Sequence, residues 1–146
     1  MPNYATLDET KQTIPDTLLA DVDDVTLGRL VTHASLTIRR ATRNATYNTD
    51  HDHLPRSETL RHTFRDATTA QVRAWLEADA VEDVLTGGAT AEATLSSTSS
   101  NGKSITLDNS AATAARARLA SGGLGAEAEL ILDAMGLLGG MPGVYR

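Results

Sequence analysis

The sequence contains no cysteine and very few aromatic residues. Its 146 residues include one Trp, one Phe and three Tyr. The lack of cysteine excludes a disulfide scaffold, a thiolate zinc site and a cysteine nucleophile. With so few aromatic side chains, the core must be built mostly from Leu, Val, Ile and Ala, and such a composition suits closely packed helices.

A long apolar run and an excess of positive charge are also missing. No stretch approaches the ~20 apolar residues that a membrane span needs, and the first residues lack the pattern of a secretory signal. We therefore expect a protein without a membrane partner that is made and kept in a cytoplasm. The 13 Lys and Arg residues are outnumbered by 19 Asp and Glu, which gives a net charge of −6. An acidic chain of this kind lacks the bulk charge for holding phosphate backbones.

Two segments in the first half of the chain have the apolar periodicity of amphipathic helices. A short helix is predicted over Thr6 to Thr13, because Pro15 disfavours helical backbone just before it. A longer helix opens at Asp21, Asp23 and Asp24, whose carboxylates face the positive end of the helix dipole. Its apolar stripe consists of Leu27, Leu30, Val31, Ala34, Ile38 and Ala41.

A second long helix is predicted from Ser57 to about Leu85. Ser57 is a favourable N-cap, and Gly87-Gly88 would end the helix. We expect this helix to be the central packing element, facing the stripe of the preceding long helix. Its apolar face consists of Leu60, Phe64, Val72, Trp75 and Leu76.

The last third of the chain changes in character. Residues 90–108 form two short alternating segments around a serine-rich tip with Asn101-Gly102, a pattern that predicts a β-hairpin. An alanine-rich helix over 111–120 should break at Gly122-Gly123, and helical spacing resumes from Ala126 to Met135. The remaining residues, 137–146, are rich in glycine, so we expect an extended tail. Its apolar side chains either dock on a partner or fold back onto the subunit's own helices.

The predicted fold class is therefore mainly α, a small helical bundle with a short β-hairpin and an extended C-terminal tail. The length of the chain corresponds to one domain. We assign residues 1–136 to the helical domain, with the hairpin at about 90–108, and residues 137–146 to the tail.

The clearest cluster of possible metal ligands is Asp50-His51-Asp52-His53. Imidazole and carboxylate both bind zinc, but a structural site needs four ligands. Neighbouring side chains of an extended loop point in different directions, and nothing in the sequence brings His33 or His62 to them. We interpret this segment as a solvated loop and predict no metal site.

Other motif-like segments favour structural interpretations. Asn101-Gly102-Lys103-Ser104 lacks the earlier glycine that a phosphate-binding loop requires. Arg39, Arg40 and Arg43 lie near a predicted helix end, where cations complement the dipole, and nucleic-acid binding is a weaker reading for an acidic chain. No serine has an identifiable histidine partner. We predict no catalytic residues and no cofactor, and we do not expect an enzyme.

Three passages share their order and hydrophobic pattern with a known family. Tyr4-Ala5-Thr6-Leu7 leads into the short helix and the first long one. The central helix contains the segment from Arg65 to Glu77, and the serine-rich hairpin precedes the segment from Leu130 to Leu138. In these features the chain resembles the head-tail connector (head-to-tail adaptor) proteins of tailed bacteriophages.

This resemblance implies a structural protein of the virion neck that is assembled in the host cytoplasm. It implies a homo-oligomeric ring, dodecameric when assembled, with the portal protein on one side and a stopper or tail protein on the other. Genomic DNA would pass through the lumen without specific binding. The residues that we predict to contact a neighbouring subunit or the portal lie in the hairpin and the tail: Leu95, Ile105, Leu107, Leu138, Met141, Val144 and Tyr145.

Two other functions remain open. A cellular helical adaptor or regulatory module would bind a single protein partner and form no ring. A small enzyme with an unrecognised site would show a deep pocket with convergent polar groups.

Overall fold

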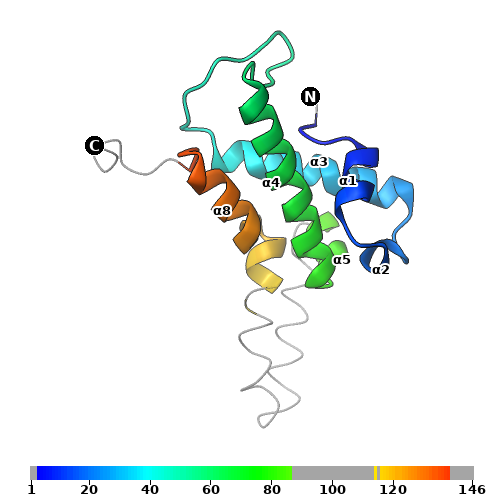
Figure 1. The fold of residues 1–146 in the computed structure, drawn as a ribbon. Helices are drawn as coiled ribbons and strands as arrows, with labels where there is room; N and C mark the ends of the chain where they lie inside the picture. The colour runs from blue at the N-terminus through cyan, green and yellow to red at the C-terminus, as the bar shows by residue number, and fades with distance from the viewer. Residues whose placement is uncertain (1–2, 87–113, 115, 139–146) are drawn as a thin grey trace.

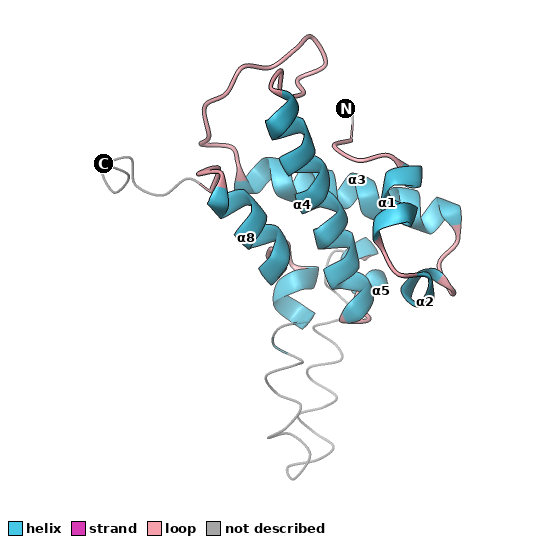
Figure 2. Cartoon of the chain, viewed as in Figure 1, coloured by secondary structure: helices cyan, strands magenta, loops and turns pink. Residues whose placement is uncertain are grey.

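A computed structural model describes residues 3–86, 114 and 116–138 of the chain, and these residues are mainly helical (Figure 2). Within these ranges the only β-type pairing is an isolated bridge between Thr49 and Pro55. The mainly α fold class is therefore confirmed, whereas the predicted hairpin at 90–108 lies outside the described residues. The helices are α1 (Leu7–Thr13), α2 (Asp16–Leu19), α3 (Asp24–Ala41), α4 (Glu58–Glu77), α5 (Val81–Leu85) and α8 (Ala126–Ala134), and residues 116–120 are also helical.

Helix α4 is the central packing element, as predicted. It packs chiefly against α8 and α3 and also touches α1, α2 and α5. Figure 1 shows α8 alongside α4, with α3 crossing behind it. Helices α3 and α8 thus each turn one face toward α4 and the opposite face outward. None of the helices in the described part of the chain is long and apolar enough to cross a membrane.

The core consists of two clusters along α4. The first surrounds Trp75 and joins the apolar stripe of α3 to α5 and to residues 119–120. The second surrounds Phe64 and joins the end of α3 to α8. Tyr4 stacks on Phe64 with ring centroids 4.7 Å apart, and the guanidinium of Arg39 lies 5.2 Å from the centroid of Tyr4. The predicted facing residues are buried, except that Leu60 and Leu76 are only partly covered.

Side-chain caps explain where three of the helices begin. The Thr6 hydroxyl accepts a hydrogen bond from the Glu9 amide, and the Glu9 carboxylate in turn accepts one from the Thr6 amide. At α3 the cap is Asp23, which accepts a hydrogen bond of 2.7 Å from the Thr26 amide, and hydrogen bonding to Thr26 lowers the pKa of Asp23. Ser57 caps α4 through the Leu60 amide. These local contacts confirm the predicted helix starts.

The prediction that the central helix runs to about Leu85 is wrong. Helix α4 ends at Glu77, and α5 begins only at Val81. Between them Asp79 adopts φ 53°, a left-handed conformation that Asp tolerates better than most residues, and the Ala80 amide donates to the Trp75 carbonyl at 2.9 Å. This turn lets Ala80 and Val84 pack into the first cluster. The short helix α2 was also not predicted.

The start of the predicted tail belongs to the core. Gly136 adopts φ 67° and ends α8, because the Leu137 amide then donates to the Leu132 carbonyl at 3.0 Å. Leu137 is buried in the second cluster, and Leu138 packs against it. For these two residues the structure supports folding back onto the subunit. Residues 139–146 lie outside the described residues.

Candidate functional site

An ion pair joins the residues that precede the segment 87–113 to the residues that follow it. Asp83 lies on α5, just before this segment, and its side chain is fully buried. Its Oδ2 accepts a hydrogen bond of 2.5 Å from Nε of Arg116, which follows the segment. A buried carboxylate is costly unless it is paired. The pair therefore joins α5 to the helical residues 116–120.

The chain after this ion pair is clamped to the helices by side chains. Nε1 of Trp75 donates to the Leu119 carbonyl at 3.1 Å. Gln71 is fully buried and uses both ends of its amide, donating to the Gly123 carbonyl at 3.1 Å and accepting from the Gly125 amide at 2.8 Å. We call residues 119–125 the anchor segment. Its path over α4 is set by hydrogen bonds from the interior of that helix.

Two glycines make this path possible. Gly122 adopts φ 104°, and its carbonyl accepts a hydrogen bond of 2.6 Å from Arg40 on α3. A Cβ at Gly125 would lie 2.7 Å from Cβ of Ala74, so only glycine lets the backbone approach α4 this closely. The predicted helix break at Gly122-Gly123 is confirmed. The ion pair and the anchor segment together form what we call the base of residues 87–113.

Sequence reasoning missed the base. Gln71 occupies a position on the apolar face of α4, between Ala67 and Trp75. A polar residue at such a core position indicates a buried hydrogen-bond partner. That signal was available, but it does not say that the partners lie more than fifty residues away, at Gly123 and Gly125.

Most of the predicted contact residues are not placed by the structure. Leu95, Ile105, Leu107, Met141, Val144 and Tyr145 lie outside the described residues. Leu138 is partly buried against the second cluster of its own subunit. The role of this set in contacts with other chains therefore stays a prediction.

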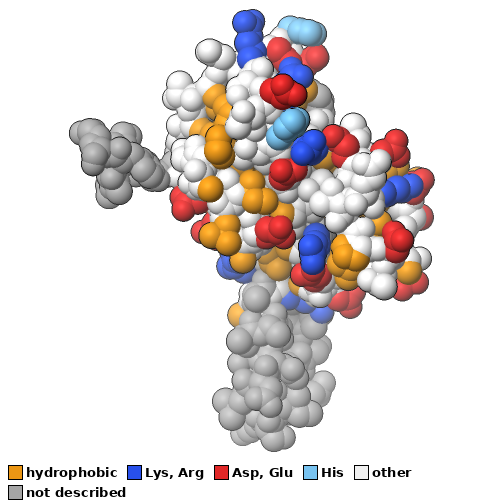
Figure 3. Space-filling view, viewed as in Figure 1, with side chains coloured by type: hydrophobic (Ala, Val, Ile, Leu, Met, Phe, Trp, Pro, Cys, Tyr) orange, Lys and Arg blue, Asp and Glu red, His pale blue; other side chains and the backbone are white. Residues whose placement is uncertain are grey.

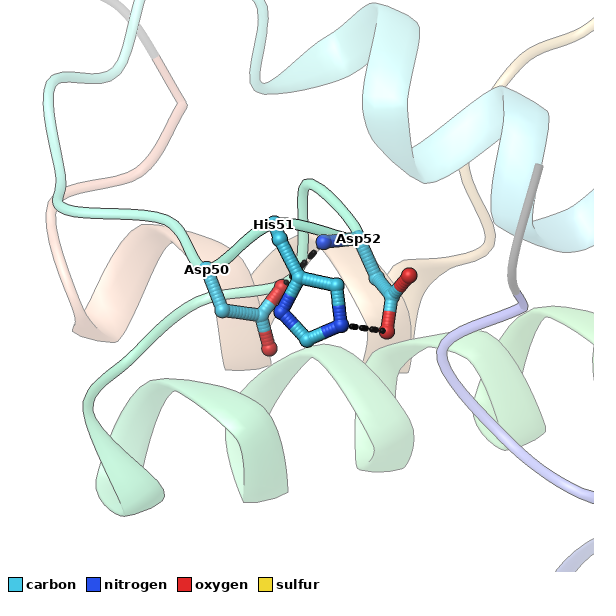
Figure 4. Close-up of side chains that lie close together, drawn as sticks. All are labelled: Asp50, His51 and Asp52. Carbon is cyan, nitrogen blue, oxygen red and sulfur yellow. Dashed lines mark hydrogen bonds and ion pairs between the residues drawn. The ribbon is translucent and has the colours of Figure 1, made fainter.

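The loop with Asp50, His51 and Asp52 is a tight turn, not an extended segment (Figure 4). Asp50 accepts hydrogen bonds at Oδ1 from the amides of Asp52, at 2.8 Å, and Leu54, at 3.1 Å. One potential ligand atom from each of Asp50, His51 and Asp52 lies within 4.8 Å of the others. The expectation that these neighbours point in different directions is therefore wrong for these three residues.

The Asp50 carboxylate already has partners. Besides the two amides, it pairs with Arg61 of α4. Desolvation raises the pKa of Asp50, but the amide hydrogen bonds and the charges of Arg61 and His51 outweigh it, so the pKa lies below its ordinary value. A metal ion would have to compete with Arg61, and the cluster offers three ligands where structural zinc uses four. The arrangement is that of a carboxylate that organises a turn.

A groove of about 440 Å³ lies beside this loop. Its lining contains charges of both signs, arginines 56, 61 and 65 together with Glu9 and Glu58. Arg65 pairs with Asp66 at 3.0 Å and lies 3.8 Å from Glu9. Because Arg61 also pairs with Asp50, two of the three arginines are engaged in surface ion pairs, which favours a structural interpretation of this groove.

Comparison with known proteins adds no relative. No family model, no curated protein and no solved structure matches the chain.

Proposed function

We propose that this chain is a structural adaptor that assembles into a ring with copies of itself, as the head-tail connectors of tailed bacteriophages do. In that role it joins a portal protein on one side to a stopper or tail protein on the other. The observation that carries the proposal is the base of residues 87–113. The resemblance in the order of helices supplies the biological setting.

The base suits a segment that reaches another chain. The ion pair of Asp83 with Arg116 and the hydrogen bonds of Trp75 and Gln71 hold the described residues before and after this segment on the helical body. Fixing the origin of a reaching segment lowers the conformational entropy that binding must overcome. The sequence of residues 96–101 is serine-rich and polar, which suits solvent or a polar partner better than a core. Strand addition or docking in a groove are the usual ways in which such a segment binds.

The charge of the chain is compatible with a ring through which DNA moves. Binding to duplex DNA depends on the release of counterions by many basic contacts. A net charge of −6 provides no general attraction for phosphate, so a lumen made from these subunits would not retain the duplex.

The first experiment deletes Ser96 to Lys103. The contacts of the base lie outside the deletion, so we expect the melting temperature of the monomer to stay within a few degrees of wild type. Binding to a candidate phage portal protein, measured by sedimentation, should be lost. A replacement of the same residues by a Gly-Ser segment of equal length is the matched control for chain length. If the deletion lowers the melting temperature of the monomer as well as abolishing portal binding, the segment belongs to the core. Unchanged portal binding would contradict the proposal that this segment contacts the portal.

The second experiment removes residues 139–146 and keeps Leu137 and Leu138. Because these two residues complete the second cluster, we expect a folded monomer. The truncated chain should no longer join the portal complex if the tail is a docking arm. Unfolding of the truncated chain, or portal binding equal to that of the full chain, would contradict this part of the proposal. A stoichiometric complex with one other protein and no ring would favour the single-partner adaptor instead.

A further inference from the structure

The outward face of α3 combines exposed apolar side chains with positive charge. Val25, Arg29, Thr32 and Leu36 follow one another at spacings of three and four, so they form one stripe along the helix. We call this stripe the α3 outer face. Val25 is 74% exposed and Leu36 is 49% exposed. Thr32 and the charged Arg29 lie between these two apolar side chains, so the stripe is mixed in character and suits an interface that combines apolar and charged contacts.

A shallow groove runs along this face. It measures about 400 Å³ and is lined by Val25, Gly28, Arg29 and Thr32, among others. A Cβ added at Gly28 would meet no atom within 4 Å. The glycine therefore leaves room beside the stripe for a side chain of another molecule.

The outward face of α8 has the opposite charge. Ala126, Leu130 and Ala134 recur every four residues, and Leu130 is 70% exposed. Glu127 and Asp133 flank this row, and α8 contains no basic residue. We call these five residues the α8 outer face. Figure 3 shows hydrophobic side chains gathered over the region of α8 with acidic side chains at their border.

Among the described residues, Arg29 and Asp133 have no oppositely charged partner, since neither lies within 4.0 Å of an oppositely charged group. Lys11, in contrast, pairs with Asp24 at 2.7 Å, at the edge of the α3 groove. Within the described residues, the two faces thus each present exposed apolar side chains beside a charge without an ion pair, and the two charges are opposite in sign.

We infer that the α3 outer face of one copy binds the α8 outer face of the next copy. The inference rests on the proposed ring and names the contact that would build it. Both helices pack their inner faces against α4 (Figure 1), so their outer faces point in different directions. A contact between two different surfaces of the same chain leaves one of each free, and it repeats until the ring closes.

Charge argues against contacts between like faces. Pairing two α3 outer faces would bring Arg29 toward Arg29, and pairing two α8 outer faces would bring Asp133 toward Asp133. Like charges that face each other across an interface are unfavourable, whereas the α3–α8 contact joins opposite charges. The occupant of each face is therefore the other face of a second copy.

The lack of native cysteine allows a direct test by disulfide trapping. Gly28→Cys places a thiol in the groove without a clash, and Ala134→Cys places one on the α8 outer face. Each variant is oxidised alone, and the two are oxidised as a mixture, at about 1 mM, where weak contacts are populated. We expect the mixture to form mixed dimers well above either variant alone, and a chain that carries both cysteines to form a ladder of multimers. Asn48→Cys, in the loop before α4, replaces Ala134→Cys as the control partner.

Charge reversal gives a second, independent readout. Arg29→Glu and Asp133→Arg should each raise the concentration needed for self-association by at least about tenfold, because each creates a like-charge contact. A mixture of the two variants should recover association. In an alternating assembly, the Glu introduced at position 29 of one variant faces the Arg introduced at position 133 of the other, and at the next contact the native Arg29 faces the native Asp133. Asp52→Arg carries the same charge change as Asp133→Arg on the loop between α3 and α4 and should have no effect.

Each outcome decides the inference. Mixed dimers together with recovery in the mixed charge variants would support it. Homodimers of one cysteine variant, or cross-linking no stronger than in the Asn48→Cys control, would overturn it. If the chain forms rings with the portal while these two faces stay uncross-linked, the contact is wrong but the proposed function stands. Failure to form rings with the portal would instead count against the function.

Discussion

Trp75 is the largest fully buried side chain among the described residues, and the effect of its removal can be worked out from its contacts. It is 1% exposed, lies in the first core cluster, and donates a hydrogen bond to the Leu119 carbonyl. Trp75→Ala leaves a cavity in that cluster, a change that costs about 3–5 kcal/mol in protein cores. The Leu119 carbonyl also loses the shorter of its two hydrogen bonds and keeps only the 3.3 Å bond from the Gly122 amide, which adds about 1 kcal/mol. Since domains of this size have only about 5–15 kcal/mol of stability, the variant should be close to unfolding.

The measurement is urea unfolding followed by circular dichroism, because the substitution removes the only tryptophan fluorophore. Trp75→Phe keeps most of the apolar volume and loses the donor, so it should cost less, about 1–2 kcal/mol. Leu76→Ala, at the next position of α4 and only partly buried, serves as the matched control and should cost less than Trp75→Ala. A Trp75→Ala protein within about 1 kcal/mol of wild type would refute the placement of this side chain at the centre of the core.

Three further predictions concern groups that the structure places in the interior or in the loop. Gln71→Leu should lower the free energy of unfolding by about 2–4 kcal/mol in urea titrations, because the Gly123 carbonyl and the Gly125 amide each lose a hydrogen bond. Burial, followed by the nearby Tyr47, raises the pKa of Tyr4 to about 12. The neutral phenol therefore contributes stability that is complete below the ordinary tyrosine pKa of about 10 and is lost as the pH rises from there through about 12. Tyr4→Phe should flatten this alkaline loss in melting curves. The double change His51→Ala with His53→Ala should leave the melting temperature unchanged, and calorimetry should show no stoichiometric zinc binding before or after it.

Each of these has a contrary result. A Gln71→Leu protein as stable as wild type would mean that water or other groups hydrogen-bond to the Gly123 carbonyl and the Gly125 amide in place of Gln71. An alkaline transition that is the same in Tyr4→Phe would assign it to another group. Zinc binding that the double histidine change abolishes would overturn the interpretation of the loop as a solvated turn.

The starts of the helices could be predicted because the cause is local. Thr6, Asp23 and Ser57 each cap a helix through residues three positions away, so the signal lies within a few letters of sequence. The core positions of α3 and α4 followed from apolar periodicity for the same reason.

The end of α4 and the base of residues 87–113 could not be predicted in this way. Ala78-Asp79-Ala80 is compatible with a helix, and the left-handed turn at Asp79 is favoured only because Ala80 and Val84 then become buried. The partners of Gln71 and Trp75 are more than forty residues distant. Tertiary packing decides both features, and no local pattern encodes it.

The central claim is that copies of this chain form a ring on a portal protein. Electron microscopy of residues 1–146 mixed with a candidate phage portal ring tests that claim most directly. The account predicts an added ring of density under the portal whose subunits contact each other through α3 and α8. Bare portal rings at saturating chain, or isolated subunits bound without contact between neighbours, would contradict it.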